Sequence, residues 1–368
     1  MPRPAQSLSP AARGAVSSLV VAPQWIGDAV MSEPLLRRLS ERGEQVTVGA
    51  LPWVAPAYRA MSSVAEVLEW PFQHGRPDLA LRWRLGRSLA GRFDRAYVLP
   101  NSLKAALLPA FAGIALRIGY QGEGRALLLN RRLPNPPGRP AMVGFYAALA
   151  LPEAPPQRVV RTPSPLDDER PRLFVAAAAV EALRRRLGVA GSPYRVFAPG
   201  AEYGPAKRWP VSHYADLARQ LIERDGLPVL LLGSHREASD CNAIAQALPP
   251  ELRDRCRSLA GETNLSEAVA LISAAKTLVS NDSGLMHVAA AFGIEQVAIF
   301  GSTSPLHTPP LNPRAKVLWL KGEPGLDCIP CFERQCRYGH TRCLTDISPD
   351  RVSSLLQAAE GVLQGDVR

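Results

Sequence analysis

Short apolar runs alternate with amphipathic helical patterns along most of the chain. Segments such as 211–226 and 265–276 repeat apolar residues at helical spacing, and apolar runs typical of buried strands lie between such segments. This alternation predicts βαβ units and parallel sheets, and so an α/β protein with one sheet in each half. The predicted strands cover 18–23, 45–51, 66–71 and 95–101 in the first half, and 194–200, 228–234, 277–282 and 295–302 in the second.

The length and a change in composition predict two domains. A chain of 368 residues exceeds one ordinary domain, and the stretch 151–175 is rich in proline and charge, as interdomain linkers are. No apolar run approaches the ~18 residues of a membrane span, so we expect a cytoplasmic protein. The predicted parts are a disordered extension (1–17), an N-terminal domain with its linker (18–175), a C-terminal domain (176–348), and a final helix (349–368) that packs back on the N-terminal domain.

Positive charge is concentrated in the first half of the chain. Residues 1–160 contain 19 Lys and Arg against 10 Asp and Glu, whereas residues 161–368 contain 24 against 23. This asymmetry predicts an anionic partner for the N-terminal half. An Arg- and Ala-rich composition alone would explain the preference for Arg but not the asymmetry. No helix-turn-helix pattern or aromatic-interleaved basic patch points to nucleic acid.

Asp28 lies where the first predicted strand turns into a helix, in the stretch VVAPQWIGDAVMSEPL. One interpretation is an N-cap, since Asp suits that position. The other is a general base, because a carboxylate at a strand end can take a proton from a hydroxyl nucleophile. Its reference pKa of ~3.9 keeps such a group ionised at neutral pH.

Two charged residues follow strands of the second half. Lys207, in the loop PGAEYGPAKRWP, is a candidate to neutralise a phosphate, although an ordinary solvated lysine fits equally well. Glu237 follows the next strand and could accept hydrogen bonds from ribose hydroxyls, or could be a first-turn acid favoured by the helix dipole. No G-x-G-x-x-G or Walker A sequence occurs.

The stretch VSNDSGLMHVAAAFG combines a strand end with a helix start. Backbone N–H groups at Ser283 and Gly284 could hold phosphate or a sugar hydroxyl, and Asp282 could grip hydroxyl groups. His287 lies one turn inside the helix, where a structural histidine is more frequent than a functional one.

These loops together describe a nucleotide-sugar site. Open parallel sheets bind ligands at the carboxyl ends of their strands, and all of these residues follow strands. The diphosphate would lie between Lys207 and the helix start at Ser283, and Asp28 would approach from the other domain. Such a site suits glycosyl transfer with inversion at the anomeric carbon.

The motifs APQWIGDAVMSEPL, PGAEYGPAKRWP, SNDSGLMHVAAA and GSTSPLHTPPL closely resemble those of the ADP-heptose:lipopolysaccharide heptosyltransferases of glycosyltransferase family 9. The resemblance covers about residues 18–360. It implies a GT-B fold of two Rossmann-like domains whose parallel sheets face each other across a cleft, and an inverting mechanism that needs no metal or cofactor. It also implies that ADP-L-glycero-D-manno-heptose is the donor.

The loop PGAEYGPAKRWP and the Cys-rich tail resemble the members that add a second heptose. The implied acceptor is the first heptose of the lipopolysaccharide inner core on lipid A, at the inner face of the cytoplasmic membrane. The resemblance places the catalytic base at Asp28, a phosphate-binding lysine at Lys207 and a ribose-binding acid at Glu237. It matches the donor-binding motif at Asp282, Ser283, Gly284 and His287, and leaves the acceptor-binding residues unknown.

The basic N-terminal half fits an acceptor that carries phosphates and carboxylates. We expect this half, including 76–95, Arg131 and Arg132, to hold the acceptor and to contact the anionic membrane leaflet peripherally. We further expect a monomer that does not bind nucleic acid.

Four cysteines cluster near the C-terminus with the spacing C-x2-C-x4-C-x6-C, at Cys328, Cys331, Cys336 and Cys343. Reduced, packed thiols are the favoured interpretation. A structural zinc site is the second, and disulfides are disfavoured in a reducing compartment.

Three other functions stay open at this point. The chain could add the first heptose directly to Kdo2-lipid A, or it could be a nucleotide-sugar epimerase of the same fold, which would need no lipid acceptor. A non-enzymatic module that binds through the basic half would not depend on Asp28.

Overall fold

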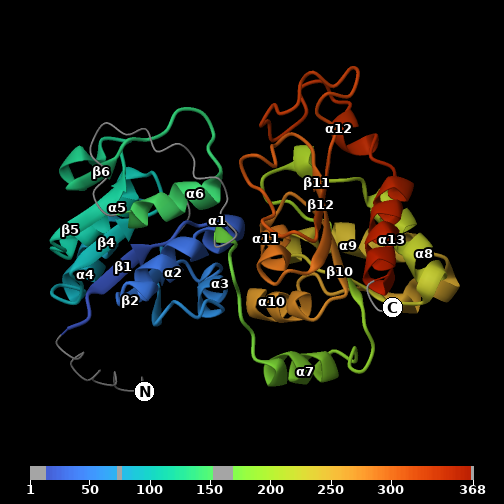
Figure 1. The fold of residues 1–368 in the computed structure, drawn as a ribbon, viewed down its shortest axis with the longest axis horizontal. Helices are drawn as coiled ribbons and strands as arrows, with labels where there is room; N and C mark the ends of the chain where they lie inside the picture. Colours follow the sequence, from blue (N-terminus) through green and yellow to red (C-terminus); the bar gives the residue numbers. More distant parts are fainter. Residues whose placement is uncertain (1–13, 73–76, 152–168, 366–368) are drawn as a thin grey trace.

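The computed structural model describes residues 14–72, 77–151 and 169–365, with side chains up to 357. Most of the expected N-terminal extension and the middle of the expected linker lie outside these ranges. The chain forms two α/β units that lie side by side, the N-terminal one in blue to green and the C-terminal one in yellow to red (Figure 1).

The first unit contains a six-stranded parallel sheet in the order β3-β2-β1-β4-β5-β6. Its central strand β1 pairs with β2 on one side and with β4 on the other. The order in which strands are added to the sheet therefore changes direction between β1 and β4. The strands are β1 (Ser17–Val21), β2 (Gln45–Ala50), β3 (Glu66–Glu69), β4 (Arg95–Val98), β5 (Leu116–Tyr120) and β6 (Arg131–Leu133).

The second unit repeats this topology with the order β12-β11-β10-β7-β8-β9, again fully parallel. Its reversal lies between β7 and β10, at the same place in the strand sequence as in the first sheet. Ligands bind at such reversal points in open parallel sheets. The strands are β7 (Arg195–Ala198), β8 (Val229–Leu231), β9 (Cys256–Ser258), β10 (Thr277–Asn281), β11 (Glu295–Phe300) and β12 (Ala315–Trp319).

The predicted α/β class and all eight predicted strands are confirmed. The four additional strands are β5, β6, β9 and β12. Each of them is at most five residues long and includes a charged residue. Their sequences therefore lack the apolar run that identifies a buried strand.

Helices cover the sheets in both units (Figure 1). The helical pattern over 29–43 forms two helices rather than one. The Ser32 hydroxyl donates to the Ala29 carbonyl at the end of α1, and the next helix begins at Glu33 with Pro34 in its first turn. The helices are α1 (Ile26–Met31), α2 (Glu33–Glu41), α3 (Ala55–Arg59), α4 (Leu79–Ser88), α5 (Leu103–Phe111), α6 (Met142–Ala147), α7 (Ala177–Arg186), α8 (Val211–Asp225), α9 (Ala238–Ala247), α10 (Leu265–Ser273), α11 (Gly284–Ala291), α12 (Arg342–Thr345) and α13 (Pro349–Gly365), with short 3-10 turns at 125–127, 148–150, 205–207, 235–237 and 250–255.

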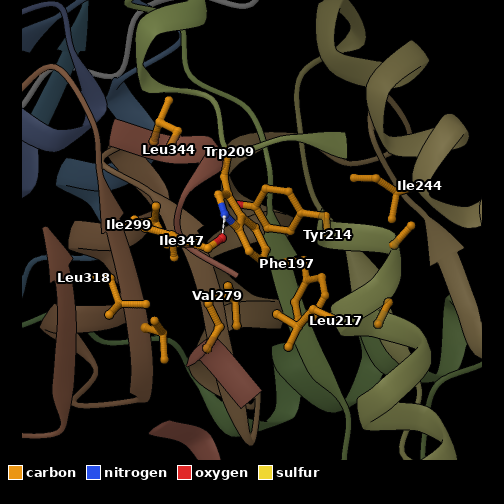
Figure 2. Packing of buried hydrophobic residues seen from close by; sticks show 14 of the residues in the cluster. Phe197, Trp209, Tyr214, Leu217, Ile244, Val279, Ile299, Leu318, Leu344 and Ile347 are labelled. Carbon is orange, nitrogen blue, oxygen red and sulfur yellow. Dashed lines mark hydrogen bonds between the residues drawn. The ribbon is translucent and has the colours of Figure 1, made fainter. Parts of the chain in front are cut away.

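The C-terminal core is built around Trp209, whose side chain is 1% exposed. Its indole packs on Tyr214, and Nε1 donates a hydrogen bond of 2.9 Å to the carbonyl of Ile347 (Figure 2). This bond satisfies a donor that would cost about 1–3 kcal/mol if it were buried alone.

The last helix does not pack back on the N-terminal domain, so that prediction is wrong. Helix α13 lies against α8 and β11, both in the C-terminal unit (Figure 1). Val352 and Leu356 are buried in the same core as Trp209. The sequence predicts the apolar face of the helix, but only the tertiary structure shows which surface that face covers.

The end of the expected linker is attached to the N-terminal unit. Glu169 is buried and pairs with Arg38 at 2.5 Å, and the Phe174 amide donates to the Ala60 carbonyl at 2.7 Å. Helix α7 then begins two residues beyond 175, close to the predicted boundary.

The two units meet where the first turn of α1 packs on the first turn of α11. A Cβ at Gly284 would lie 2.7 Å from the Ile26 Cβ, and a Cβ at Gly27 would lie 2.9 Å from the His287 ring. Only glycine at both positions lets the two helices approach this closely.

We predict that Gly284→Ala weakens this contact. The alanine methyl would overlap the Ile26 Cβ, which cannot move aside because it is attached directly to the backbone. Alanine also has a higher helix propensity than glycine, but this gain offsets only part of the strain. We expect the free energy of unfolding to fall by about 1–2 kcal/mol in chemical denaturation. Gly14→Ala is the matched control, since a Cβ at Gly14 meets no atom within 4 Å. Equal stability of the two variants would contradict the prediction.

Candidate active site

Asp28 occupies the third residue of α1 and does not cap the helix. The N-cap position belongs to Trp25, and no side chain caps the helix start. The Asp28 carboxylate instead accepts a hydrogen bond of 2.8 Å at Oδ1 from the hydroxyl of Tyr146 in α6. The N-cap interpretation is therefore wrong, and the carboxylate is available for other chemistry.

The environment of Asp28 shifts its proton affinity. Burial raises the pKa of the carboxyl group, while the Tyr146 hydrogen bond and the charges of His307 and Lys207 lower it. The nearby Asp282 carboxylate raises it again. Lys207 and Asp282 belong to the C-terminal unit, so charges from both units affect the pKa of Asp28. A raised pKa brings a carboxylate closer to the range in which a general base is effective.

Lys207 lies at the end of the 3-10 turn 205–207 that follows β7. Its ammonium forms an ion pair with Asp282 Oδ2 at 2.6 Å and lies 4.9 Å from the centre of the Tyr203 ring. Both partners of the ion pair are largely buried, with side chains 12% and 4% exposed. The positive charge is therefore fixed in place beside Asp28 rather than solvated.

Asp282 anchors this lysine and is itself held by two threonine hydroxyls. Its Oδ2 also accepts from Thr303 Oγ1 at 2.6 Å, and its Oδ1 accepts from Thr308 Oγ1 at 3.3 Å. A carboxylate engaged at both oxygens is less suited to bind a further hydroxyl group. The geometry thus gives Asp282 a positioning task toward Lys207 in addition to the expected contact with the sugar.

Asn281, next to Asp282, ties the lysine loop to the sheet. Its Oδ1 accepts hydrogen bonds from the Trp209 amide at 3.0 Å and the Tyr214 hydroxyl at 3.2 Å, and its Nδ2 donates to the Pro199 carbonyl at 2.6 Å. The side chain is fully buried. It therefore holds both ends of the loop that carries Lys207.

The start of α11 holds Ser283, Gly284 and His287. Ser283 is the N-cap residue, and its buried hydroxyl has no hydrogen-bond partner among the described residues. Such a group is costly unless a ligand satisfies it. Gly284 presses on Ile26, and the His287 ring lies against Gly27. Burial lowers the pKa of His287 to about 4, so its imidazole is neutral at pH 7.

Glu237 lies apart from this group, at the carboxyl ends of β7 and β8. Its Oε2 accepts a hydrogen bond of 2.7 Å from the Ser234 amide in a capping box, so the first-turn interpretation applies at least in part. Its carboxylate also covers Gly200, where a Cβ would lie 1.8 Å from Oε1. The carboxylate thus stands over the loop that leads to Lys207.

Tyr146 and His307 belong to the site but are not predicted as site residues from the sequence. His307 is held by hydrogen bonds to the N-terminal unit, since Nδ1 is 2.6 Å from the Pro140 carbonyl and its own carbonyl accepts from the Met142 amide at 2.9 Å. His307 follows β11, and this strand-end position could have identified it. Tyr146 has no such signal, because it reaches Asp28 from the middle of a helix.

The structure brings Asp28, Lys207 and Asp282 together, and it places His287 at the contact between the units. None of the described side chains forms a group of three or more His, Cys, Asp or Glu arranged to hold a metal ion. All six cysteines are free thiols.

Comparison with known proteins agrees with this geometry. Residues 82–342 match the family model for glycosyltransferase family 9 (heptosyltransferase). The chain is 42% identical to lipopolysaccharide heptosyltransferase 2 of Escherichia coli, over 92% of this chain and 97% of that one, and 40% identical to lipooligosaccharide heptosyltransferase 2 of Haemophilus influenzae, over 90% and 96%. A heptosyltransferase 1 of Pseudomonas aeruginosa matches at 29% over 46% of this chain and 48% of its own.

The fold agrees as well. The solved structure of the Escherichia coli ADP-heptose lipopolysaccharide heptosyltransferase II superimposes with a TM-score of 0.81 at 39% identity, covering 96% of this chain and all of that one. The expected arrangement of two Rossmann-like sheets is confirmed. The chain belongs to glycosyltransferase family 9, the heptosyltransferases.

Proposed function

We propose that the protein transfers heptose from ADP-L-glycero-D-manno-heptose to the first heptose of the lipopolysaccharide inner core, with inversion. The observation that carries this proposal is the meeting of Asp28 with Lys207. A carboxylate of one domain, which can accept a proton, stands beside a fixed positive charge of the other domain. Glycosyl transfer from a nucleoside diphosphate needs both groups at one place.

In the proposed reaction Asp28 accepts the proton of the acceptor hydroxyl as its oxygen attacks the anomeric carbon. The bond from that carbon to the diphosphate breaks, and its electron pair leaves with ADP. Lys207 neutralises the charge that develops on the leaving phosphate. No metal enters this step, since a fixed ammonium can supply the charge stabilisation.

The donor would lie on the C-terminal unit. The unpaired Ser283 hydroxyl and the amide of Gly284 would bind the diphosphate, in line with the preference of helix starts for anions. Glu237 would accept hydrogen bonds from the ribose. We propose that Asp282 and His287 contribute to the sugar pocket, His287 through its neutral ring and Asp282 chiefly by positioning Lys207.

The N-terminal unit would hold the acceptor, and its charge favours an anionic molecule. Several arginines of the expected basic surface have internal partners, however. Arg82 is buried, where it stacks on Phe72 and donates to the Pro77 carbonyl. Arg92 and Arg95 pair with Glu66 and Glu44. The arginines left to bind an external anion are therefore fewer than the sequence indicates.

The outward face of α4 is the best candidate for contact with the membrane. Leu79 and Trp83 are 56% and 54% exposed, and Arg87 follows on the same face, with the exposed Arg84 beside it. A stripe of apolar and basic residues is typical of helices that lie on anionic bilayers. No described helix is long and apolar enough to cross a bilayer. We propose a peripheral, monomeric protein at the cytoplasmic face.

Addition of the first heptose to Kdo2-lipid A is the second candidate. It is less well supported, because the heptosyltransferase 1 match is both weaker and shorter than the heptosyltransferase 2 matches. The two candidates differ only in the acceptor.

The proposed function is tested by measuring ADP release and product mass with ADP-heptose and heptosyl-Kdo2-lipid A. We expect one heptose to be added without divalent metal, and Asp28→Asn to lower the rate by about 10²–10⁴-fold, the usual contribution of a general base. Glu41→Ala, which removes an exposed carboxylate of the same domain, should leave the rate unchanged. Transfer to Kdo2-lipid A alone would favour the second candidate, and full activity of Asp28→Asn would remove the base assignment.

A pH profile tests the role of Tyr146. A base must be ionised, so the rate should fall as the pH drops through the raised pKa of Asp28. Tyr146→Phe removes a hydrogen bond that lowers this pKa. We therefore expect the acidic limb of the kcat profile to move to higher pH in the variant. An unchanged limb would mean that Asp28 is not the titrating group.

Vesicle flotation tests the membrane face. We expect wild-type protein to bind vesicles that contain anionic lipid and to release them at high salt, because the attraction is screened. Trp83→Ala with Arg84→Glu and Arg87→Glu should abolish binding. Phe174→Ala, which removes an apolar side chain that is 69% exposed elsewhere, is the control. Binding by the triple variant at the wild-type level would contradict the proposal.

A further inference from the structure

The cysteine-rich segment between β12 and α12 brings four thiols to one cavity. Cys328, Cys331, Cys336 and Cys343 all line a space of about 20 Å³ in the loops beside α12 (Figure 1). The four thiols therefore face one small space, although they come from positions up to 15 residues apart in the chain.

The sulfur of Cys336 lies in a nest of backbone amides. The N–H groups of Tyr338, Gly339, His340 and Thr341 donate to it. Gly339 and Thr341 have φ values of 72° and 46°, which turn successive amides toward one point. Nests of this kind stabilise anions and occur around cluster-bound and metal-bound sulfur.

The two other cysteines do not line this cavity. Cys241 in α9 and Cys256 in β9 are buried in the apolar core, and burial raises the pKa of each to about 12. These thiols behave as packed small side chains. A thiol that only fills space in a core needs no group of amide donors such as the nest around Cys336.

The segment also has no secondary structure of its own. No helix or strand lies between Trp319 and Arg342, all of which belongs to the described chain. Loops of this length without secondary structure are uncommon in compact domains unless something constrains them. Leu326 and Ile329 reach the core, but the part that follows Ile329 contributes no further residue to it before Cys343.

This segment braces the loops that form the active site. The Ala206 amide donates to the Arg334 carbonyl at 3.1 Å, and the Phe332 amide donates to the Ser302 carbonyl at 2.7 Å. The Tyr203 hydroxyl donates to the Phe332 carbonyl. The position of Lys207, one residue after Ala206, thus depends on how firmly the cysteine-rich segment is held.

We propose that Cys328, Cys331, Cys336 and Cys343 bind one soft divalent metal ion of the zinc or ferrous type, and that this ion fixes the brace behind Lys207. Four thiolates in tetrahedral geometry select such ions. Each thiol loses its proton on binding, so four protons are released and the charge of the site becomes −2, which the amide nest offsets in part.

The thiols line the cavity without a ligating arrangement in this structure, so binding requires rotation about their Cα–Cβ bonds. His340 is not needed as a ligand. Its Nδ1 accepts from the Arg342 amide at 3.0 Å, and its ring stacks on Tyr338. The proposal is independent of the sugar acceptor and donor assigned above.

Metal analysis of protein purified without a metal-affinity tag tests this site directly. We expect about one zinc or iron ion per chain. Cys331→Ser and Cys336→Ser should lose it, whereas Cys241→Ser, Cys256→Ser and His340→Ala should retain it. A metal-free protein in which all six thiols react after unfolding would overturn the proposal in favour of reduced thiols, and a protein with fewer reactive thiols and no metal would overturn it in favour of disulfides.

The wild-type protein provides a second readout if the variants fail to fold. Release of the ion with a mercurial reagent, followed by thiol to remove the mercury, should lower Tm and weaken ADP binding. Added zinc should restore both. Unchanged Tm and ADP binding after the ion has left would show that it does not support the Lys207 loop. Neither result depends on heptose transfer.

Discussion

The close contact between α1 and α11 is the constraint on which the rest of the site depends. Each helix follows a strand at the reversal point of its own sheet, and each begins its first turn against the other. Gly27 and Gly284 remove the side chains that would hold the helices apart. Because Asp28 follows Gly27 and Asp282 precedes Gly284 by two residues, this single approach sets a carboxylate of one domain beside the ion pair of the other.

The charges at the site are arranged by burial and by pairing, and the two effects oppose each other. Burial favours the protonated form of Asp28, while the Tyr146 hydroxyl and the charges of His307 and Lys207 favour its ionised form. Lys207 is paired with Asp282 in the interior. A buried ion pair adds little to stability by itself, yet it holds a charge at a defined place. This organisation suits an enzyme better than a passive binding surface.

A second layer of contacts stands behind these residues. Asn281 holds the ends of the lysine loop, Thr303 and Thr308 hold Asp282, and the cysteine-rich segment braces the loop through backbone hydrogen bonds. Small changes in such supports displace reacting groups by distances that matter for rate. The proposed metal would act at this level.

The sequence by itself determined the fold class, eight of the strands and the strand-end positions of Asp28, Lys207, Glu237 and Asp282, because apolar periodicity and short motifs are local properties. Only the tertiary structure decided what depends on distant contacts. It showed that Asp28 is not an N-cap, that Tyr146 and His307 reach it from other elements, and that α13 packs on the C-terminal unit. It also buried Arg82, and it paired Arg92 and Arg95 with Glu66 and Glu44 from other segments of the chain. A residue's type and its neighbours in sequence predict what it can do, but burial and partners from elsewhere in the chain decide what it does.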